Sequence, residues 1–286
     1  MPKFEHSTLF REAELICKNF SSVNDQLSET YQAAELINGL FRDIIYEEFA
    51  YQDPEPWQQA SVLLTFGASQ SWVMAYINSS AGLIDISKMI LRRAIEFVCY
   101  LSKACQSNER AELWFKRSES LANKKEFTNI YNVPNCYFTD KYSHLRPLLV
   151  LHDQVSEVSV HANYETLLSK FTKDDTDHID TISLHDVNDN KLASTDLILI
   201  TGYKILGSAL STVIENLGNQ SRINTTFTSL RDKVRKARVS LAELDYTGNI
   251  PQATLDDINN DTGEGLKQSF DSLIARYHRR DKTGVV

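Results

Sequence analysis

Apolar residues recur at intervals of three and four along most of the chain, the spacing that places them on one face of an α-helix. The pattern predicts a first helix that begins after Ser7 and runs over residues 9–20, followed by helices over residues 29–51, 56–77, 81–105 and 108–123. It predicts later helices over residues 148–162, 194–217, 227–244 and 266–278. We therefore expect an all-α fold, a multi-helix bundle.

Two stretches interrupt this pattern. Residues 172–190 carry six Asp and have no helical period, so we expect an acidic loop or a short hairpin excursion there, the hairpin passing through residues 179–187. Residues 218–226 are polar and follow a long apolar segment. We place a boundary there, between a helical bundle over 1–220 and a C-terminal helical region over 221–286.

The segment from 81 to 105 has the clearest amphipathic pattern. Projected at about 100° per residue, its apolar residues share one broad face, and Asp85, Arg92 and Glu96 fall opposite. The face comprises Leu83, Ile84, Ile90, Leu91, Ala94, Ile95, Phe97, Val98 and Leu101. We expect this face to enter the core.

Composition agrees with a soluble helical protein. The 286 residues include only 10 Gly and 6 Pro, too few turn residues for a many-stranded sandwich, propeller or barrel. Apolar residues make up 42% and charged residues 24%, which excludes wholesale disorder, and the net charge of -8 gives no general attraction to nucleic acid.

We expect the protein to be cytoplasmic and not to span a membrane. Charged residues interrupt the first apolar stretch, unlike a secretory signal, and Lys204 interrupts the most apolar run, residues 197–210, which we interpret as a buried helix. The four cysteines, Cys17, Cys99, Cys105 and Cys136, show no C-x-x-C spacing, so we expect them to be small core residues.

Several common signatures are absent. The chain has no G-x-x-x-x-G-K-[ST], no G-x-G-x-x-G after a strand and no H-E-x-x-H, which argues against a P-loop NTPase, a Rossmann dehydrogenase and a zincin. Asp153, Glu157 and His161 follow at four-residue steps, but a bundle di-metal site needs matching E-x-x-H elements on partner helices. We predict no metal and no cofactor, and a solvated face for this stripe.

Arg146 and His152 carry the candidate chemistry. The two are separated by five residues, and Pro147 between them marks a helix start, so Arg146 is expected just ahead of the helix, where its side chain can converge with His152. This spacing resembles the R-x(4–6)-H motif of HEPN domains, a superfamily of helical bundles that includes many metal-independent ribonucleases. LRRAIEFVCYL at 91–101, followed by the helix with Ser156 and His161, is similar to an uncharacterised bacterial helical family associated with HEPN proteins.

The resemblance covers residues 60–217 and implies a site shared by two chains of a homodimer. RNA cleavage through the 2′-OH needs a group that titrates near neutrality, which suits His152, and a fixed cation, which suits Arg146. Arg93 and Glu96 are candidate supporting residues, with Ser156 and His161. The alternatives are a core-edge His152 with a surface Arg146, and an ordinary surface pair between Arg93 and Glu96.

A locally basic helix lies in the C-terminal region. Residues 231–238, RDKVRKAR, align Arg231, Arg235 and Arg238 beside an apolar face. These residues could bind RNA phosphates or an acidic protein partner, or they could form a solvated face.

Two functions follow from these patterns. The first is a HEPN-like, metal-independent endoribonuclease that acts as a toxin or defence factor. The alternative is a non-catalytic helical interaction or regulatory module.

Overall fold

The computed structural model describes residues 8–43, 45, 53–133, 145–159, 171–173, 179–182, 198–199, 202, 205, 207 and 209. This part of the chain is helical apart from one small antiparallel pair of strands, which confirms the all-α prediction. Its elements are α1 (Thr8–Gln26), α2 (Ser28–Asp43), α3 (Pro56–Ser80), α4 (Ile84–Ala104), α5 (Asn108–Phe115), α6 (Leu121–Tyr131), α7 (Arg146–Ser159), β1 (Phe171–Lys173) and β2 (Ile179–Ile182).

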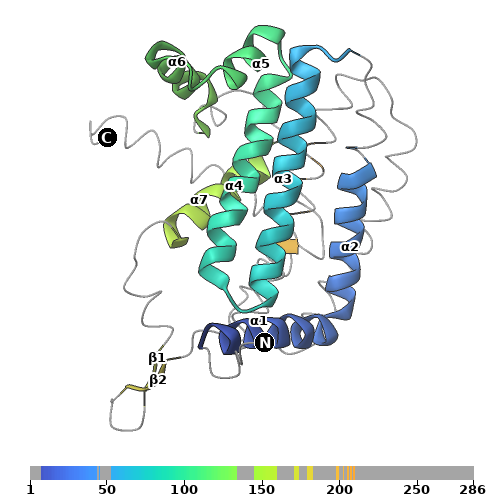
Figure 1. The fold of residues 1–286 in the computed structure, drawn as a ribbon, viewed down its shortest axis with the longest axis vertical. Coiled ribbons are helices and arrows are strands. Elements are labelled where there is room, and N and C mark those ends of the chain that lie inside the picture. Colours follow the sequence, from blue (N-terminus) through green and yellow to red (C-terminus); the bar gives the residue numbers. More distant parts are fainter. Residues whose placement is uncertain are drawn as a thin grey trace, which may run out of the picture.

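A long antiparallel hairpin of α3 and α4 forms the centre of the molecule (Figure 1). The tight turn between the two helices contains Gly82, whose φ of 87° lies in the left-handed region that favours glycine. Farther along, the Ser87 hydroxyl donates to the Ala75 carbonyl at 2.8 Å. At the open end, the Ser61 hydroxyl and the Cys105 thiol lie 2.9 Å apart. These two contacts join α3 to α4 near both ends of the hairpin.

Helix α3 begins where the sequence indicates, because Pro56 at its first position suits the helical φ and needs no hydrogen-bond acceptor. Gln58 accepts from the Glu55 backbone N–H at 2.8 Å, and the Glu55 carboxylate accepts from the Asn108 amide at 3.2 Å. The start of α3 is thereby tied to the start of α5.

The remaining helices surround the hairpin. Helix α1 crosses its turn end, where the Asn19 amide donates to the Ala81 carbonyl, and α2 stands beside α3 (Figure 1). Helices α5 and α6 cap the opposite end, and α7 packs against α4. The largest core cluster lies among α2, α3, α4 and α7 and includes Trp72, whose indole N–H donates to the Ile198 carbonyl at 2.9 Å.

The prediction of one helix over 108–123 is wrong, because the segment holds the end of one helix and the start of another. Helix α5 stops at Phe115, and α6 begins at Leu121. The Ser120 hydroxyl accepts from the Asn123 backbone N–H at 3.0 Å, so it caps a new helix. The Arg117 guanidinium lies 4.8 Å from the Trp114 ring centroid, which folds the connection back onto α5.

Other helix ends differ by a few residues. Helix α1 continues to Gln26 because Val23 is buried and the Asn24 amide oxygen accepts from the Tyr76 hydroxyl at 2.9 Å. Helix α4 begins at Ile84 rather than Ala81, because residues 81–83 form the turn. Residues 44 and 46–51 of the predicted 29–51 helix lie outside the described residues. The same holds for residues 160–162 of the predicted 148–162 helix.

The cysteine prediction is partly wrong. Cys99 and Cys105 are buried, as expected, but Cys17 is exposed. Burial raises the pKa of the Cys105 thiol to about 11, despite its hydrogen bond with Ser61, so this thiol is unreactive at neutral pH. Cys136 lies outside the described residues.

The acidic excursion holds the strand pair. Strand β1 pairs with β2 in antiparallel register, Phe171 opposite Ile182 and Thr172 opposite Thr181. Residues 174–178 and 183–190 lie outside the described part, as do the proposed boundary at 218–226 and the predicted helices over 227–244 and 266–278. Of the apolar run 197–210, Ile198, Leu199, Ile205 and Ala209 are helical and fully buried. None of the described helices combines the length and apolarity that a bilayer crossing requires.

Candidate functional site

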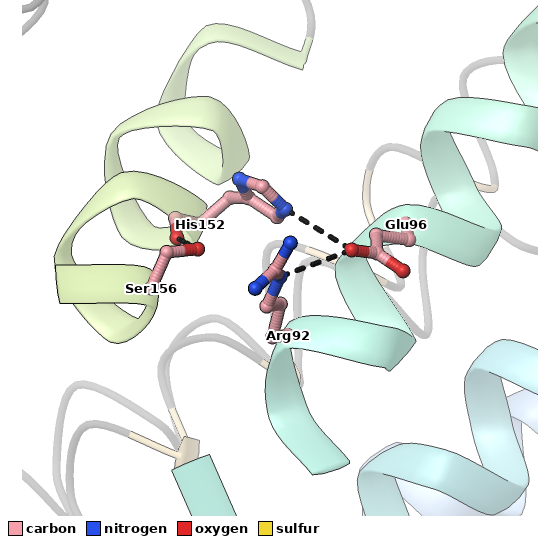
Figure 2. A network of polar contacts seen from close by, with 4 residues as sticks. All are labelled: Arg92, Glu96, His152 and Ser156. Carbon is pink, nitrogen blue, oxygen red and sulfur yellow. Dashed lines mark hydrogen bonds and ion pairs between the residues drawn. The ribbon is translucent and has the colours of Figure 1, made fainter. Parts of the chain in front are cut away.

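His152 lies in the second turn of α7, on the side that packs against α4 (Figure 2). Leu148, Leu151 and Val155 of the same helix are buried, which places the imidazole at the edge of the core, as in the core-edge alternative that the sequence left open. The residue is 8% exposed. A buried imidazole needs a polar partner, and α4 provides one.

That partner is Glu96. The His152 Nε2 atom lies 3.4 Å from Glu96 Oε1, and the Arg92 Nε–H donates to the same carboxylate oxygen at 3.0 Å (Figure 2). The side chains of Arg92 and Glu96 are 33% and 27% exposed, so the cluster is open to solvent on the α4 side. We call Arg92, Glu96 and His152 the α4–α7 polar cluster.

Glu96 remains ionised in this cluster. Burial raises the pKa of its carboxyl group, but the hydrogen bond from His152 and the charges of His152 and Arg92 outweigh burial and leave the pKa below its ordinary value of 4.5. An ionised carboxylate only accepts hydrogen bonds. The His152 Nε2 atom is therefore the donor in this contact and carries a proton.

This assignment leaves the other ring nitrogen of a neutral His152 as a proton acceptor. Figure 2 shows that nitrogen, Nδ1, on the far side of the ring from Glu96. A carboxylate that fixes the tautomer and orientation of an imidazole is the arrangement found in acid–base catalysis. The Arg92 guanidinium uses its Nε–H to bond Glu96, and its terminal nitrogens point toward the His152 side of the cluster (Figure 2).

Arg146 is not ahead of the helix, as the sequence suggested, but is the first residue of α7. Six residues of α-helix correspond to a rotation of about 240° and a rise of about 9 Å. The Cα–Cβ bonds of Arg146 and His152 therefore leave α7 about 120° apart around its axis. The adjacent fixed cation at His152 is Arg92 of the neighbouring helix.

Arg93 does not form the predicted ordinary pair with Glu96, because Glu96 pairs with Arg92 at i,i+4. The Arg93 guanidinium instead lies over the Phe97 ring, 5.4 Å from its centroid. One residue of difference turns Arg93 about 100° away from Arg92, onto the exposed side of α4.

Ser156 bonds within its own helix. Its hydroxyl donates to the His152 carbonyl at 2.5 Å, so it supports the backbone that carries the imidazole (Figure 2). His161, Arg231, Arg235 and Arg238 lie outside the described residues. Across the described residues, His, Cys, Asp and Glu side chains form no group of three or more suited to a metal ion.

Sequence reasoning missed Arg92, which it placed on the face away from the core. The i,i+4 spacing of Arg92 and Glu96 is a visible signal, but Arg93 at i,i+3 is an equally valid helical partner for Glu96. The packing of α7 beside α4 decides between the two arginines.

Comparisons of the chain with protein-family models, with curated proteins and with solved structures found no match.

Proposed function

We propose that this protein is a HEPN-like, metal-independent endoribonuclease that acts as a toxin or defence factor, with His152 as its proton-transfer group. The observation that supports the proposal is the shared contact of His152 and Arg92 with one Glu96 oxygen, at 3.4 and 3.0 Å. It places an oriented imidazole and a guanidinium side by side, the two kinds of group that RNA cleavage without a metal requires.

The reaction uses the RNA's own hydroxyl. His152 takes the proton from the 2′-OH, the 2′ oxygen forms a bond to phosphorus, and the bond from phosphorus to the 5′ oxygen breaks. The imidazolium returns its proton to the leaving 5′ oxygen, so the products are a 2′,3′-cyclic phosphate and a free 5′-OH. Glu96 holds the ring and stabilises the imidazolium that forms. A guanidinium binds the phosphoryl oxygens as their charge increases, and Arg92 and Arg146 are the two candidates for this role.

The test is cleavage of several single-stranded RNAs by the purified full-length protein in EDTA. We expect cleavage that His152→Ala abolishes and that Glu96→Gln reduces by about ten- to a hundredfold, a range typical of lost positioning or acid–base support. Comparing the cleavage rates of Arg92→Lys and Arg146→Lys identifies the phosphate-binding cation. Lysine keeps the positive charge but lacks the planar fork of the guanidinium, so the variant at the phosphate-binding position loses more activity. Arg93→Lys is the matched control, one residue along the same helix, and should cleave normally.

The measurement can contradict the proposal in two ways. One is the absence of metal-independent cleavage with every RNA tested. The other is cleavage that persists in His152→Ala while the variant unfolds at the wild-type temperature.

The non-catalytic interaction module is the second candidate, favoured by the exposed apolar side chains Leu63, Phe66, Met74, Ile86 and Met89, each 47–55% exposed. Exposed apolar surface on a helical bundle is typical of an interaction site. The basic residues Arg231, Arg235 and Arg238 fit either function, as an RNA contact or as a partner contact, and this remains a prediction.

A further inference from the structure

The end of α5 and the start of α6 form a basic turn in an acidic chain. We define the α5–α6 elbow as residues 114–125, in which one acid, Glu119, stands against the bases Lys116, Arg117, Lys124 and Lys125. The whole chain carries a net charge of -8. The elbow is therefore a local region of positive charge, which favours contact with an anionic ligand.

Contacts within the elbow hold the end of α5 against the start of α6. The Asn123 side-chain amide donates to the Lys116 carbonyl at 3.0 Å, and the Lys116 ammonium pairs with Glu112 at 2.7 Å. Lys124 and Lys125 are exposed, and neither forms an ion pair with the residues that the structure describes. Their ammonium groups are therefore available to a ligand.

Planar side chains continue from the elbow toward α4. The Arg117 guanidinium lies 4.8 Å from the Trp114 ring centroid and 6.0 Å from the Phe127 ring centroid, and its Nη1 donates to the Trp114 carbonyl at 2.6 Å. The Phe127 and Tyr100 rings meet edge to face, with centroids 5.7 Å apart. All four side chains are half-buried, so each keeps part of its surface in solvent. Lys124 lies about 60° from Phe127 around the axis of α6, on the side of these planes.

This row of planes ends one helical turn from the α4–α7 polar cluster. Tyr100 follows Glu96 by four residues, so the two lie on the same side of α4, about 6 Å apart along its axis. On that side α7 contributes His152 next to Glu96, and α6 contributes Phe127 next to Tyr100 (Figure 1). Burial and then the charge of Glu96 raise the pKa of Tyr100 to about 12, and the charge of Arg117 opposes them. Tyr100 therefore lies within electrostatic reach of both the cluster and the elbow.

Cations beside planar side chains suit one class of anionic ligand, a single strand of nucleic acid. Basic side chains follow the phosphates of such a strand, and aromatic rings and guanidinium planes stack on its unpaired bases. The bases of a duplex are already stacked and paired, so they gain little from the planes. The carboxylates of an acidic peptide would use the cations alone.

We propose that single-stranded RNA extends from the α4–α7 polar cluster across Tyr100 to the α5–α6 elbow. Arg117 and Lys124 bind phosphates of the segment that flanks the cleaved bond, and Trp114 stacks on one of its bases. The inference rests on the proposed ribonuclease function for its ligand, and it adds the surface that holds the strand.

The binding test uses the full-length protein in EDTA with a fluorescently labelled 2′-O-methyl oligouridine, which has no free 2′-OH and is not cleaved. Each phosphate contact contributes about 0.7 to the slope of log Kd against log salt concentration for a single strand. We expect Lys124→Gln to lower the slope by about 0.7, and Arg117→Gln with Lys124→Gln to lower it by about 1.4. Lys125→Gln is the matched control, because Lys125 lies about 160° from Phe127 around α6, and should keep the wild-type slope.

Tryptophan fluorescence tests the stacking. The oligonucleotide should quench the fluorescence of the wild type, and Trp114→Phe should remove this quenching, whereas Trp57→Phe at the start of α3 should keep it. Thermal unfolding of each variant checks that its fold is intact.

Cleavage and binding separate this inference from the ribonuclease itself. His152→Ala should bind the oligonucleotide as the wild type does, and Lys124→Gln should raise KM for RNA cleavage and leave kcat unchanged. A protein that binds through the elbow but cleaves no RNA would contradict the ribonuclease and support the elbow. An unchanged Kd and KM in Arg117→Gln with Lys124→Gln, tighter binding of duplex RNA, or equally effective competition by polyglutamate would overturn the elbow.

Discussion

At the scale of single residues, the α4–α7 polar cluster depends on Glu96. Its carboxylate accepts from two different helices, from Arg92 on α4 and from His152 on α7. Burial alone would favour the protonated acid, but the two donors reverse that preference and lower the pKa. The charge of Glu96 is therefore part of what holds α7 against α4.

This gives a pH-dependent stability with a definite sign. Because the folded-state pKa of Glu96 lies below its unfolded value, the carboxylate stabilises the fold above about pH 4.5, and this contribution is lost as the pH falls through the folded-state pKa. We expect the free energy of unfolding of Glu96→Gln to depend less steeply on pH than that of the wild type in this acidic range. Urea unfolding from pH 3 to pH 7, roughly the range over which carboxyl groups titrate, measures the difference. Parallel pH profiles for the two proteins would show that the contact has no energetic role.

At the scale of elements, close approach decides which helices fit together. The backbone at Gly202 passes so near Trp72 that a Cβ there would lie 2.1 Å from the indole nitrogen. The same indole nitrogen donates to the Ile198 carbonyl, so Ile198 and Gly202 both lie directly against α3. Glycine is required here by space, not by backbone conformation.

Two glycine substitutions test this packing. Gly202→Ala should destabilise the protein by about 1–3 kcal/mol, as overpacking of a core does. Gly39→Ala on α2 meets no atom within 4 Å and should instead stabilise the fold by about 0.5–1 kcal/mol. Chemical unfolding measures both. In a Trp72→Phe background the cost of Gly202→Ala should shrink, and a cost unchanged by Trp72→Phe would contradict the contact.

At the scale of the whole molecule, α4 joins two core clusters. Leu91, Ile95 and Val98 belong to the larger cluster with α2, α3 and α7, and Leu101 and Ala104 belong to the smaller one with the start of α3, α5 and α6. Phe97 and Tyr100 pack against both clusters. Since one helix carries both, neither cluster is expected to unfold while the other persists.

We therefore expect one cooperative unfolding transition for the described helices. Leu101→Ala in the smaller cluster should lower the free energy of unfolding by about 2–5 kcal/mol, and should shift the helical circular dichroism and tryptophan fluorescence transitions together. Leu121→Ala, at a position 87% exposed, is the control and should change stability by less than about 0.5 kcal/mol. Two separate transitions in Leu101→Ala would show that α5 and α6 form an independent unit.

The sequence by itself determined the fold class and the position of most helices. Apolar spacing located α3, α4 and α7, and Pro56 marked the start of α3, because helix period and proline geometry are local properties. The spacing also placed His152 at the edge of its core stripe. It did not separate α5 from α6, since that break depends on the Ser120 cap and on the stacking of Arg117 on Trp114.

The tertiary structure alone decided which polar residues meet. Arg92 and Arg93 are equivalent in sequence as partners of Glu96, and only the position of α7 makes Arg92 part of the cluster and leaves Arg93 over Phe97. Local pattern sets the helices, whereas the relative placement of helices distant in sequence sets the polar cluster, because the cluster is made of side chains from two helices.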